Sequence, residues 1–209
     1  TYDKKKEFTK SFAFRMKTDS EKKLTRNTGF YERTSKLTRN FVDARGFWLP
    51  NDYTKHGVIN EYTACREKAV VIDLSSLRKF EILGPDAEEL MNYTLTRNIK
   101  KLSVGQIVYS AMCYENGTMF DDGTLLRLSE TGFRWVCGDE YAGEWLKEQA
   151  KKKNLKVVIK NSTDQINNLS VQGPNSRKIL EKIIFTPPTQ PTISELQWFR
   201  FTICRLEEL

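Results

Sequence analysis

The segment 105–128 constrains the fold more than any other, because it has the pattern of a β-hairpin. Residues 108–113 are rich in β-branched, aromatic and other apolar side chains, which favour an extended strand. Asn116-Gly117 then supplies the positive φ that a tight hairpin turn needs. Residues 118–128 have the composition of the returning strand. The chain is therefore predicted to contain an antiparallel sheet built around this hairpin.

Two adjacent carboxylates, Asp121 and Asp122, interrupt the apolar pattern of the second strand. Strands disfavour Asp, and alternation sends neighbouring side chains to opposite faces of a sheet. One of the two is therefore predicted to face the buried side, where a carboxylate needs a partner or a function. A pair beside Gly123 also fits a β-bulge, or edge-strand charges that prevent aggregation. The pattern alone leaves these interpretations open.

The residues of this hairpin resemble the folate-binding hairpin of the aminomethyltransferases, the T-protein family of the glycine cleavage system. The matching residues are Tyr109-Ser110-Ala111-Met112-Cys113, Asn116-Gly117 and Asp121-Asp122. Further segments that agree with the family in order and spacing are residues 64–82, Gly84-Pro85-Asp86-Ala87 and Val171-Gln172-Gly173-Pro174. Within the first of them, Asp73-Leu74-Ser75-Ser76 and Lys79-Phe80-Glu81 are similar to the folate domains of sarcosine and dimethylglycine dehydrogenases. The resemblance covers residues 29–209.

The resemblance implies an α+β, T-protein-like folate-binding fold with mainly antiparallel sheets. Residues 76–154 are expected to form an inserted α+β domain that carries the hairpin. Residues 29–75 together with 155–209 are expected to form an incomplete, discontinuous first domain, preceded by a polar arm over 1–28. Members of the family continue beyond the point where this sequence stops. We therefore expect the C-terminal portion of the fold to be missing and the chain to carry only part of the folate site.

The local patterns add expectations for individual elements. Strands 78–83, 107–113, 118–128 and 132–137 are predicted to share one antiparallel sheet. Helices are predicted at 58–68, 86–95, 140–153 and 174–183, further strands at 70–74, 155–159, 169–172 and 196–206, and a loop at 48–50. The repeated Gly-Pro after a strand and before a helix, at Gly84 and Gly173, suggests two similar α+β units.

The resemblance also implies that tetrahydrofolate is the cofactor, as the acceptor of a one-carbon unit on its N5 and N10 nitrogens. Asp122 matches the family's catalytic and folate-binding carboxylate. N10 is a weak nucleophile, and a carboxylate beside it can orient the nitrogen, take up its proton and stabilise cationic character. Asp121 is expected to face away from the cavity and to cap or pair locally.

Four other residues are expected to contact folate. Tyr109 and Trp198 match aromatic residues that line the family's pocket, although Trp198 is equally compatible with a core aromatic on a strand. Thr124 lies two residues beyond Asp122, on the same strand face. Cys137 ends the third strand of the sheet, where family members often offer a polar contact. Here Cys replaces the usual Asn or Thr, which weakens that contact.

The leading interpretation is a tetrahydrofolate-dependent aminomethyl or methylene transferase of the T-protein type. It implies a lipoyl carrier protein or an amine-dehydrogenase partner. Two alternatives share the fold. One is a non-catalytic folate-binding protein of the RNA-modification or iron–sulfur assembly type. The other is a folate-dependent demethylase of a methylamine or sulfonium substrate. The presence of Asp122 favours an enzyme over a folate-binding module.

The net charge of +7 raises the question of nucleic acid. The basic residues are scattered, however, and their densest clusters are Lys4-Lys5-Lys6 and Lys151-Lys152-Lys153. The second cluster ends a predicted helix, where cations complement the helix dipole. Without a recognised nucleic-acid motif, such binding is not favoured.

The remaining composition indicates a reducing compartment, the cytoplasm or, in a eukaryote, the mitochondrial matrix. The four cysteines show no Cys-x-x-Cys spacing, and His56 is the only histidine, so neither a metal site nor disulfides are expected. The sequence has no apolar run of membrane-spanning length and no signal-peptide core at its start.

Overall fold

The computed structural model describes residues 25–206, so most of the predicted polar arm lies outside the described residues. The chain forms two compact units. Among the described residues, the first contains residues 25–76 together with Asn167–Ser176, and the second contains Leu77–Ile166 together with residues 177–206. The predicted inserted domain stays a prediction, because dense contacts do not by themselves establish an insertion. The second unit nevertheless extends past residue 154, the boundary expected from the sequence.

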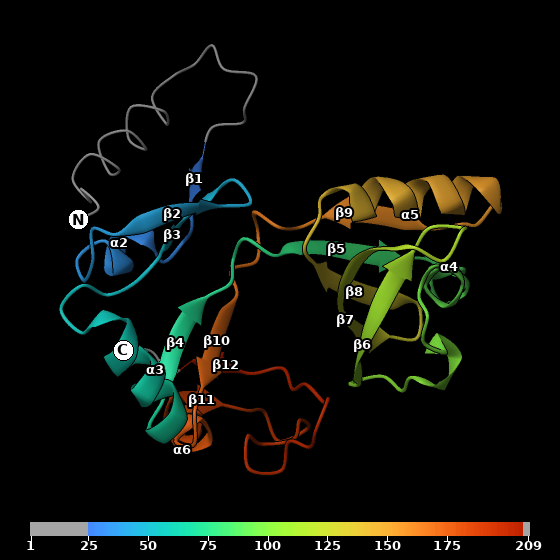
Figure 1. The fold of residues 1–209 in the computed structure, drawn as a ribbon. Helices are drawn as coiled ribbons and strands as arrows, with labels where there is room; N and C mark the ends of the chain where they lie inside the picture. Colours follow the sequence, from blue (N-terminus) through green and yellow to red (C-terminus); the bar gives the residue numbers. More distant parts are fainter. Residues whose placement is uncertain (1–24, 207–209) are drawn as a thin grey trace. The chain divides into compact units, whose positions relative to one another are not determined.

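The described part of the first unit contains two small sheets and two helices, which are labelled in Figure 1. β3 (Phe47–Pro50) pairs with β1 (Arg26–Asn27) in parallel and with β2 (Phe41–Ala44) antiparallel. β4 (Val70–Asp73) pairs antiparallel with β10 (Leu169–Gln172). The helices are α2 (Tyr31–Thr34) and α3 (Gly57–Glu67). The pairing of β4 with β10 joins segments that are far apart in the sequence.

The second unit is built on a five-stranded sheet in the order β6-β7-β8-β5-β9. The strands are β5 (Arg78–Leu83), β6 (Ile107–Cys113), β7 (Met119–Ser129), β8 (Gly132–Cys137) and β9 (Val158–Asn161). Every neighbouring pair is antiparallel, which confirms the predicted sheet. β9 lies at its edge beside β5, although the sequence analysis assigned residues from 155 onward to the other domain.

One face of this sheet is covered by α4 (Ala87–Thr94) and α5 (Tyr141–Lys152), with the short 3-10 helix η1 (Ile99–Lys101) beside them (Figure 1). The core between them is apolar and fully buried at its centre. It includes Ile82, Leu90, Met112, Leu125, Phe133, Trp135 and Leu146. The helices are amphipathic, so burying their apolar sides on this face stabilises the unit. α6 (Ser176–Ile183), β11 (Ile184–Phe185) and β12 (Arg205–Leu206) complete the described chain.

The two Gly-Pro turns have the same backbone geometry. Gly84 has a φ of 135° and Gly173 a φ of 131°. An added Cβ would lie 2.5 Å from the carbonyl oxygen of Lys156 in the first case and of Lys68 in the second. In each unit this one glycine meets two requirements: a positive φ that other residues disfavour, and a neighbouring backbone that leaves no room for a Cβ.

Two local predictions are wrong. Trp48 to Pro50 belong to a buried strand rather than a loop, and the hairpin turn that creates it has positive φ at Arg45 and Gly46. Residues 196–206 do not form one strand, because only Arg205–Leu206 make a strand and Arg200 makes a single bridge to Gln106. Across residues 25–206, no helix has the length and hydrophobicity needed to cross a membrane.

Candidate functional site

The candidate site begins with a pair of side chains on the face of the sheet that α4 and α5 do not cover. The hydroxyl of Tyr109, on β6, donates a hydrogen bond to the carboxylate of Asp122, on β7. The antiparallel register places Tyr109 directly opposite Thr124 and Ala111 opposite Asp122. Because strand residues alternate, Tyr109, Asp122 and Thr124 share one face. Asp122 is exposed there, and Tyr109 is 51% exposed.

This pairing affects the chemistry of the phenol. The hydrogen bond to Asp122 raises the pKa of Tyr109, with smaller contributions from desolvation and from the charges of Asp122 and Asp121. A phenol that stays protonated remains a donor to the carboxylate. The pair therefore presents an oriented carboxylate, with one oxygen held by Tyr109, at the surface of the hairpin.

Asp121 has the opposite environment. It is 9% exposed, and its carboxylate accepts three backbone N–H bonds. Oδ1 accepts from Asp122 and Gly138 at 2.9 and 3.2 Å, and Oδ2 accepts from Asp139 at 3.0 Å. The expectation that Asp121 faces away and caps locally is confirmed. Asp121 thus ties the end of β8 to the strand that carries Asp122.

Gly123 explains how the strands can approach so closely beside the two acids. A Cβ at this position would lie 2.2 Å from the carbonyl oxygen of Val136 on β8. Any larger residue would push β7 and β8 apart. On β6, which pairs with the other edge of β7, the carbonyl oxygen of Tyr109 accepts a hydrogen bond from Arg97 Nε at 3.4 Å.

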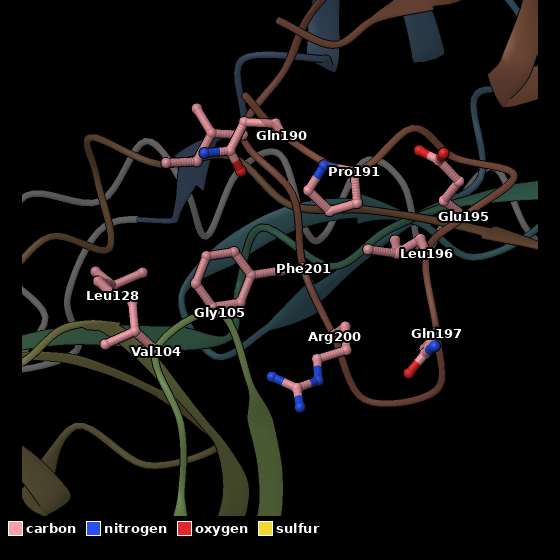
Figure 2. A pocket seen from close by; sticks show the side chains of 11 residues that line it. Val104, Gly105, Leu128, Gln190, Pro191, Glu195, Leu196, Gln197, Arg200 and Phe201 are labelled. Carbon is pink, nitrogen blue, oxygen red and sulfur yellow. The ribbon is translucent and has the colours of Figure 1, made fainter. Parts of the chain in front are cut away.

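A cleft of about 460 Å³ lies in the same unit, beside the start of β6. Figure 2 shows Phe201 in the middle of its lining, with Val104 and Leu128 on one side and Pro191 and Leu196 on the other. The segment that closes it is held by backbone bonds, from Ile107 N–H to the Phe199 carbonyl at 2.8 Å and from Phe201 N–H to the Gly105 carbonyl at 3.1 Å. Over the described part of the chain, no group of acidic, histidine and cysteine side chains is arranged to hold a metal ion.

The sequence matches the family described as the GCVT N-terminal domain over residues 30–208. The chain belongs to this family. It is 52% identical over 206 residues to a trimethylamine-oxide aldolase from Ruegeria pomeroyi, which covers 99% of this chain. It is 33% identical over 180 residues to an aminomethyltransferase from Symbiobacterium thermophilum, which covers 83% of it.

The solved structure of the glycine cleavage system aminomethyltransferase T from Bartonella henselae has the same fold. It superimposes with a TM-score of 0.69 at 26% identity and covers 84% of this chain. The GCVT chain described here spans 26% of the Ruegeria protein, 46% of the Symbiobacterium protein and 46% of the Bartonella chain. The expected α+β, mainly antiparallel fold is therefore confirmed, for a chain that matches only part of its relatives.

The prediction for Cys137 needs correction. Its side chain is 2% exposed and belongs to the apolar core, because Cys137 lies opposite Gly123 and shares the buried face with Asp121. Burial, reinforced by the charge of Asp121, raises the pKa of the thiol, so it stays protonated. In this GCVT domain the thiol cannot line the face that carries Asp122.

Trp198 is not on a strand. It lies in a turn, is 88% exposed, and its ring contacts Phe199 with 5.3 Å between centroids. Phe199 has a φ of 53°, which interrupts an extended backbone. Within residues 25–206, the structure brings Tyr109, Asp122 and Thr124 together, whereas Trp198 makes no described contact with them.

Two residues on the same face were missed by the sequence analysis. Ile107 lies two positions before Tyr109, and Leu126 lies opposite it on β7. Both are partly buried and provide an apolar surface beside Thr124. The period-two alternation that assigned Thr124 to this face would also have identified them.

Proposed function

We propose that the protein containing this GCVT domain transfers a one-carbon unit to tetrahydrofolate, and that Asp122 is its catalytic carboxylate. The observation that carries the proposal is the hydrogen-bonded pair of Tyr109 and Asp122, on the hairpin that resembles the family's folate-binding hairpin. An exposed carboxylate oriented by a neighbouring phenol, and not neutralised by a cation in the described structure, suits acid–base work on a ligand.

The chemistry of the acceptor explains why such a carboxylate is useful. When a nitrogen of tetrahydrofolate attacks a one-carbon unit, it acquires positive charge and must lose a proton. Asp122 can stabilise that charge and accept the proton. Tyr109, which donates to Asp122, fixes the carboxylate and offers a ring face to a flat ligand, while Ile107 and Leu126 add apolar surface. Thr124 offers a hydroxyl to the same ligand.

A second candidate concerns the donor. The 52% identity to a trimethylamine-oxide aldolase favours a donor derived from a methylated amine. An aldolase-type cleavage of trimethylamine oxide, C3H9NO, yields dimethylamine, C2H7N, and formaldehyde, CH2O, so the atoms balance. In this version the domain captures formaldehyde on tetrahydrofolate, with release of water. An aminomethyl donor on a lipoyl carrier protein and delivery from an amine-dehydrogenase partner are the competing proposals.

The acceptor is tested by calorimetric titration of the full-length protein with tetrahydrofolate. We expect saturable binding in the wild type and in Asp122→Asn. Absence of heat and of saturation at millimolar ligand would reject the proposed function. Binding without any one-carbon transfer would instead support the non-catalytic folate-binding alternative.

The donor is tested with carbon-13 label in single-turnover reactions on the tetrahydrofolate-loaded protein. Labelled trimethylamine oxide and labelled formaldehyde are expected to deliver label to tetrahydrofolate faster than an aminomethylated lipoyl carrier does. The reverse order of rates would favour an aminomethyltransferase of the glycine cleavage type.

A further inference from the structure

A small cleft lies at the edge of the second unit, separate from the face that carries Asp122. It has a volume of about 230 Å³ and lies between the C-terminal end of α4, the hairpin turn after β6 and α5. Its lining includes Tyr93, Thr94, Tyr114, Glu115, Trp145 and Gln149. α5 packs on the core side of the sheet through Leu146 and Ala150. The cleft therefore belongs to the opposite side of the sheet from the proposed folate site.

Two polar groups in this lining have no described partner. Trp145 Nε1 and Gln149 Nε2 are both buried, and neither makes a hydrogen bond within residues 25–206. The Gln149 side chain is 1% exposed and the Trp145 side chain 8%. Buried N–H donors are almost always satisfied in folded proteins. Trp145 and Gln149 are four residues apart, so they lie on the same side of α5, and each has a donor without an acceptor.

Aromatic rings form the walls around these donors. Tyr114 meets Trp145 edge to face, with 5.5 Å between ring centroids and an interplanar angle of 83°. Tyr93 adds a third ring from the end of α4. Rings beside two N–H groups that lack an acceptor suit a ligand with a flat or compact apolar body and an oxygen at one end.

The charges at the mouth favour an anion. Lys152 Nζ lies 5.7 Å from the Trp145 ring centroid and Lys153 Nζ lies 4.2 Å from that of Tyr93. Glu115 offers the one carboxylate of the lining, and it is paired with Lys152 at 3.0 Å. Lys153 makes no ion pair within residues 25–206, and both ammonium groups already occupy ring faces that a cationic ligand would need.

We propose that this cleft binds a small organic carboxylate, whose oxygens accept hydrogen bonds from Trp145 Nε1 and Gln149 Nε2 and whose apolar body lies against Tyr93 and Tyr114. A cavity of 230 Å³ is smaller than sites for drug-sized ligands, so the ligand is of the size of a small metabolite. Both donors are shielded from solvent in the described state. Binding therefore requires the Gln149 amide and the indole of Trp145 to rotate toward the cleft. The site is independent of folate binding.

The test follows the indole N–H signals of the full-length protein, labelled with nitrogen-15 in tryptophan, during titration with benzoate. The Trp145 signal, assigned by its loss in Trp145→Phe, is expected to shift in a saturable way. Gln149→Leu should weaken benzoate by about tenfold or more, the size expected when a bond to a charged group is lost. Gln165→Leu, at an exposed position in the same unit, is the matched control and should bind as the wild type does.

Benzamide separates the charge from the shape, because it has the same ring and a neutral head group. It should bind more weakly than benzoate. Equal binding of the two would overturn the carboxylate assignment, and no shift with either would overturn the site. An unchanged benzoate affinity in Gln149→Leu would also reject it. That variant replaces an unsatisfied amide with an apolar group of similar size, so it is expected to fold. Prior saturation with tetrahydrofolate should leave the benzoate titration unchanged.

Discussion

The two faces of the β6–β7 hairpin give neighbouring, chemically identical residues opposite environments. Asp121 points to the covered face, where it accepts backbone N–H groups of residues 122, 138 and 139. Asp122 points to the other face, where the hydroxyl of Tyr109 is its described partner. Both follow from the two-residue period of a strand. A carboxylate saturated by backbone donors builds structure, whereas an exposed and oriented one remains available to a ligand.

The first prediction tests the catalytic side of this comparison and carries the largest expected effect. Asp122→Asn should keep the fold and most of the affinity for tetrahydrofolate, because the amide has nearly the same shape. One-carbon transfer should fall by about 10²-fold or more, the scale of losing a positioned acid–base group. The measurement is single-turnover transfer by the full-length protein, with a melting curve to establish that the variant is folded.

Asp121→Asn is the matched control for that experiment, because the two substitutions are chemically identical. Its turnover, measured at a temperature where the variant is folded, should stay within a few-fold of the wild type. An equal loss of turnover in the two variants, or a larger loss in Asp121→Asn, would show that the two faces do not divide the roles as proposed.

The second prediction concerns Gly123, which follows Asp122 on β7 and belongs to the covered face. Gly123→Ala should lower the free energy of unfolding by about 3 kcal/mol, because the added Cβ meets backbone that cannot move alone. The close contact is with the Val136 carbonyl oxygen, 2.2 Å from the added atom. Urea unfolding measures the change. Thr124→Ala, at the next residue along, removes atoms and should lower the free energy of unfolding by less than about 1 kcal/mol. An unchanged free energy of unfolding in Gly123→Ala would refute this tight packing.

The third prediction tests whether Asp121 stabilises the fold. Asp121→Asn should lower the free energy of unfolding by about 2 kcal/mol, because its new NH₂ group cannot accept the N–H bonds that the carboxylate now receives. If the asparagine oxygen takes the position of Oδ1, its NH₂ group takes the position of Oδ2. The backbone N–H of Asp139 then loses its acceptor. Thermal unfolding of both aspartate variants makes the comparison. A larger stability loss in Asp122→Asn than in Asp121→Asn would contradict the assignment.

The hairpin, its turn and the division between the two acids could be predicted from the sequence, since each depends on local alternation. Asn116-Gly117 marks the turn, and the alternation of side chains along the strand then places Asp121 and Asp122 on opposite faces. Cys137 was misplaced because its face depends on the β7–β8 register, which shifts between Arg127 and Ser129. One extra residue reverses the face of every later side chain, and this shift has no clear mark in the sequence.

Trp198 was misplaced for a different reason. The alternating apolar residues after Leu196 favour a strand, but Phe199 adopts a positive φ and the segment is held through backbone bonds to β6. A left-handed conformation at a bulky residue is uncommon, so sequence propensity could not anticipate it. Trp48 was missed because positive φ at Arg45, a non-glycine residue, made the preceding hairpin turn hard to recognise.

The smallest expected effect is a shift in the titration of Tyr109, and it measures the pair directly. The hydrogen bond to Asp122 raises the pKa of Tyr109 above its ordinary value of about 10. Any stability that the pair contributes is thus present below that ordinary value and is lost as the pH rises through the higher folded pKa.

Carbon-13 tyrosine signals, assigned with Tyr109→Phe, follow this ionisation. Asp122→Asn should return the pKa of Tyr109 toward 10, whereas Asp121→Asn should change it little, because the Asp121 charge is the weakest of the contributions. If the two variants shift it equally, the phenol responds to the general field of the hairpin, and Tyr109 does not orient Asp122.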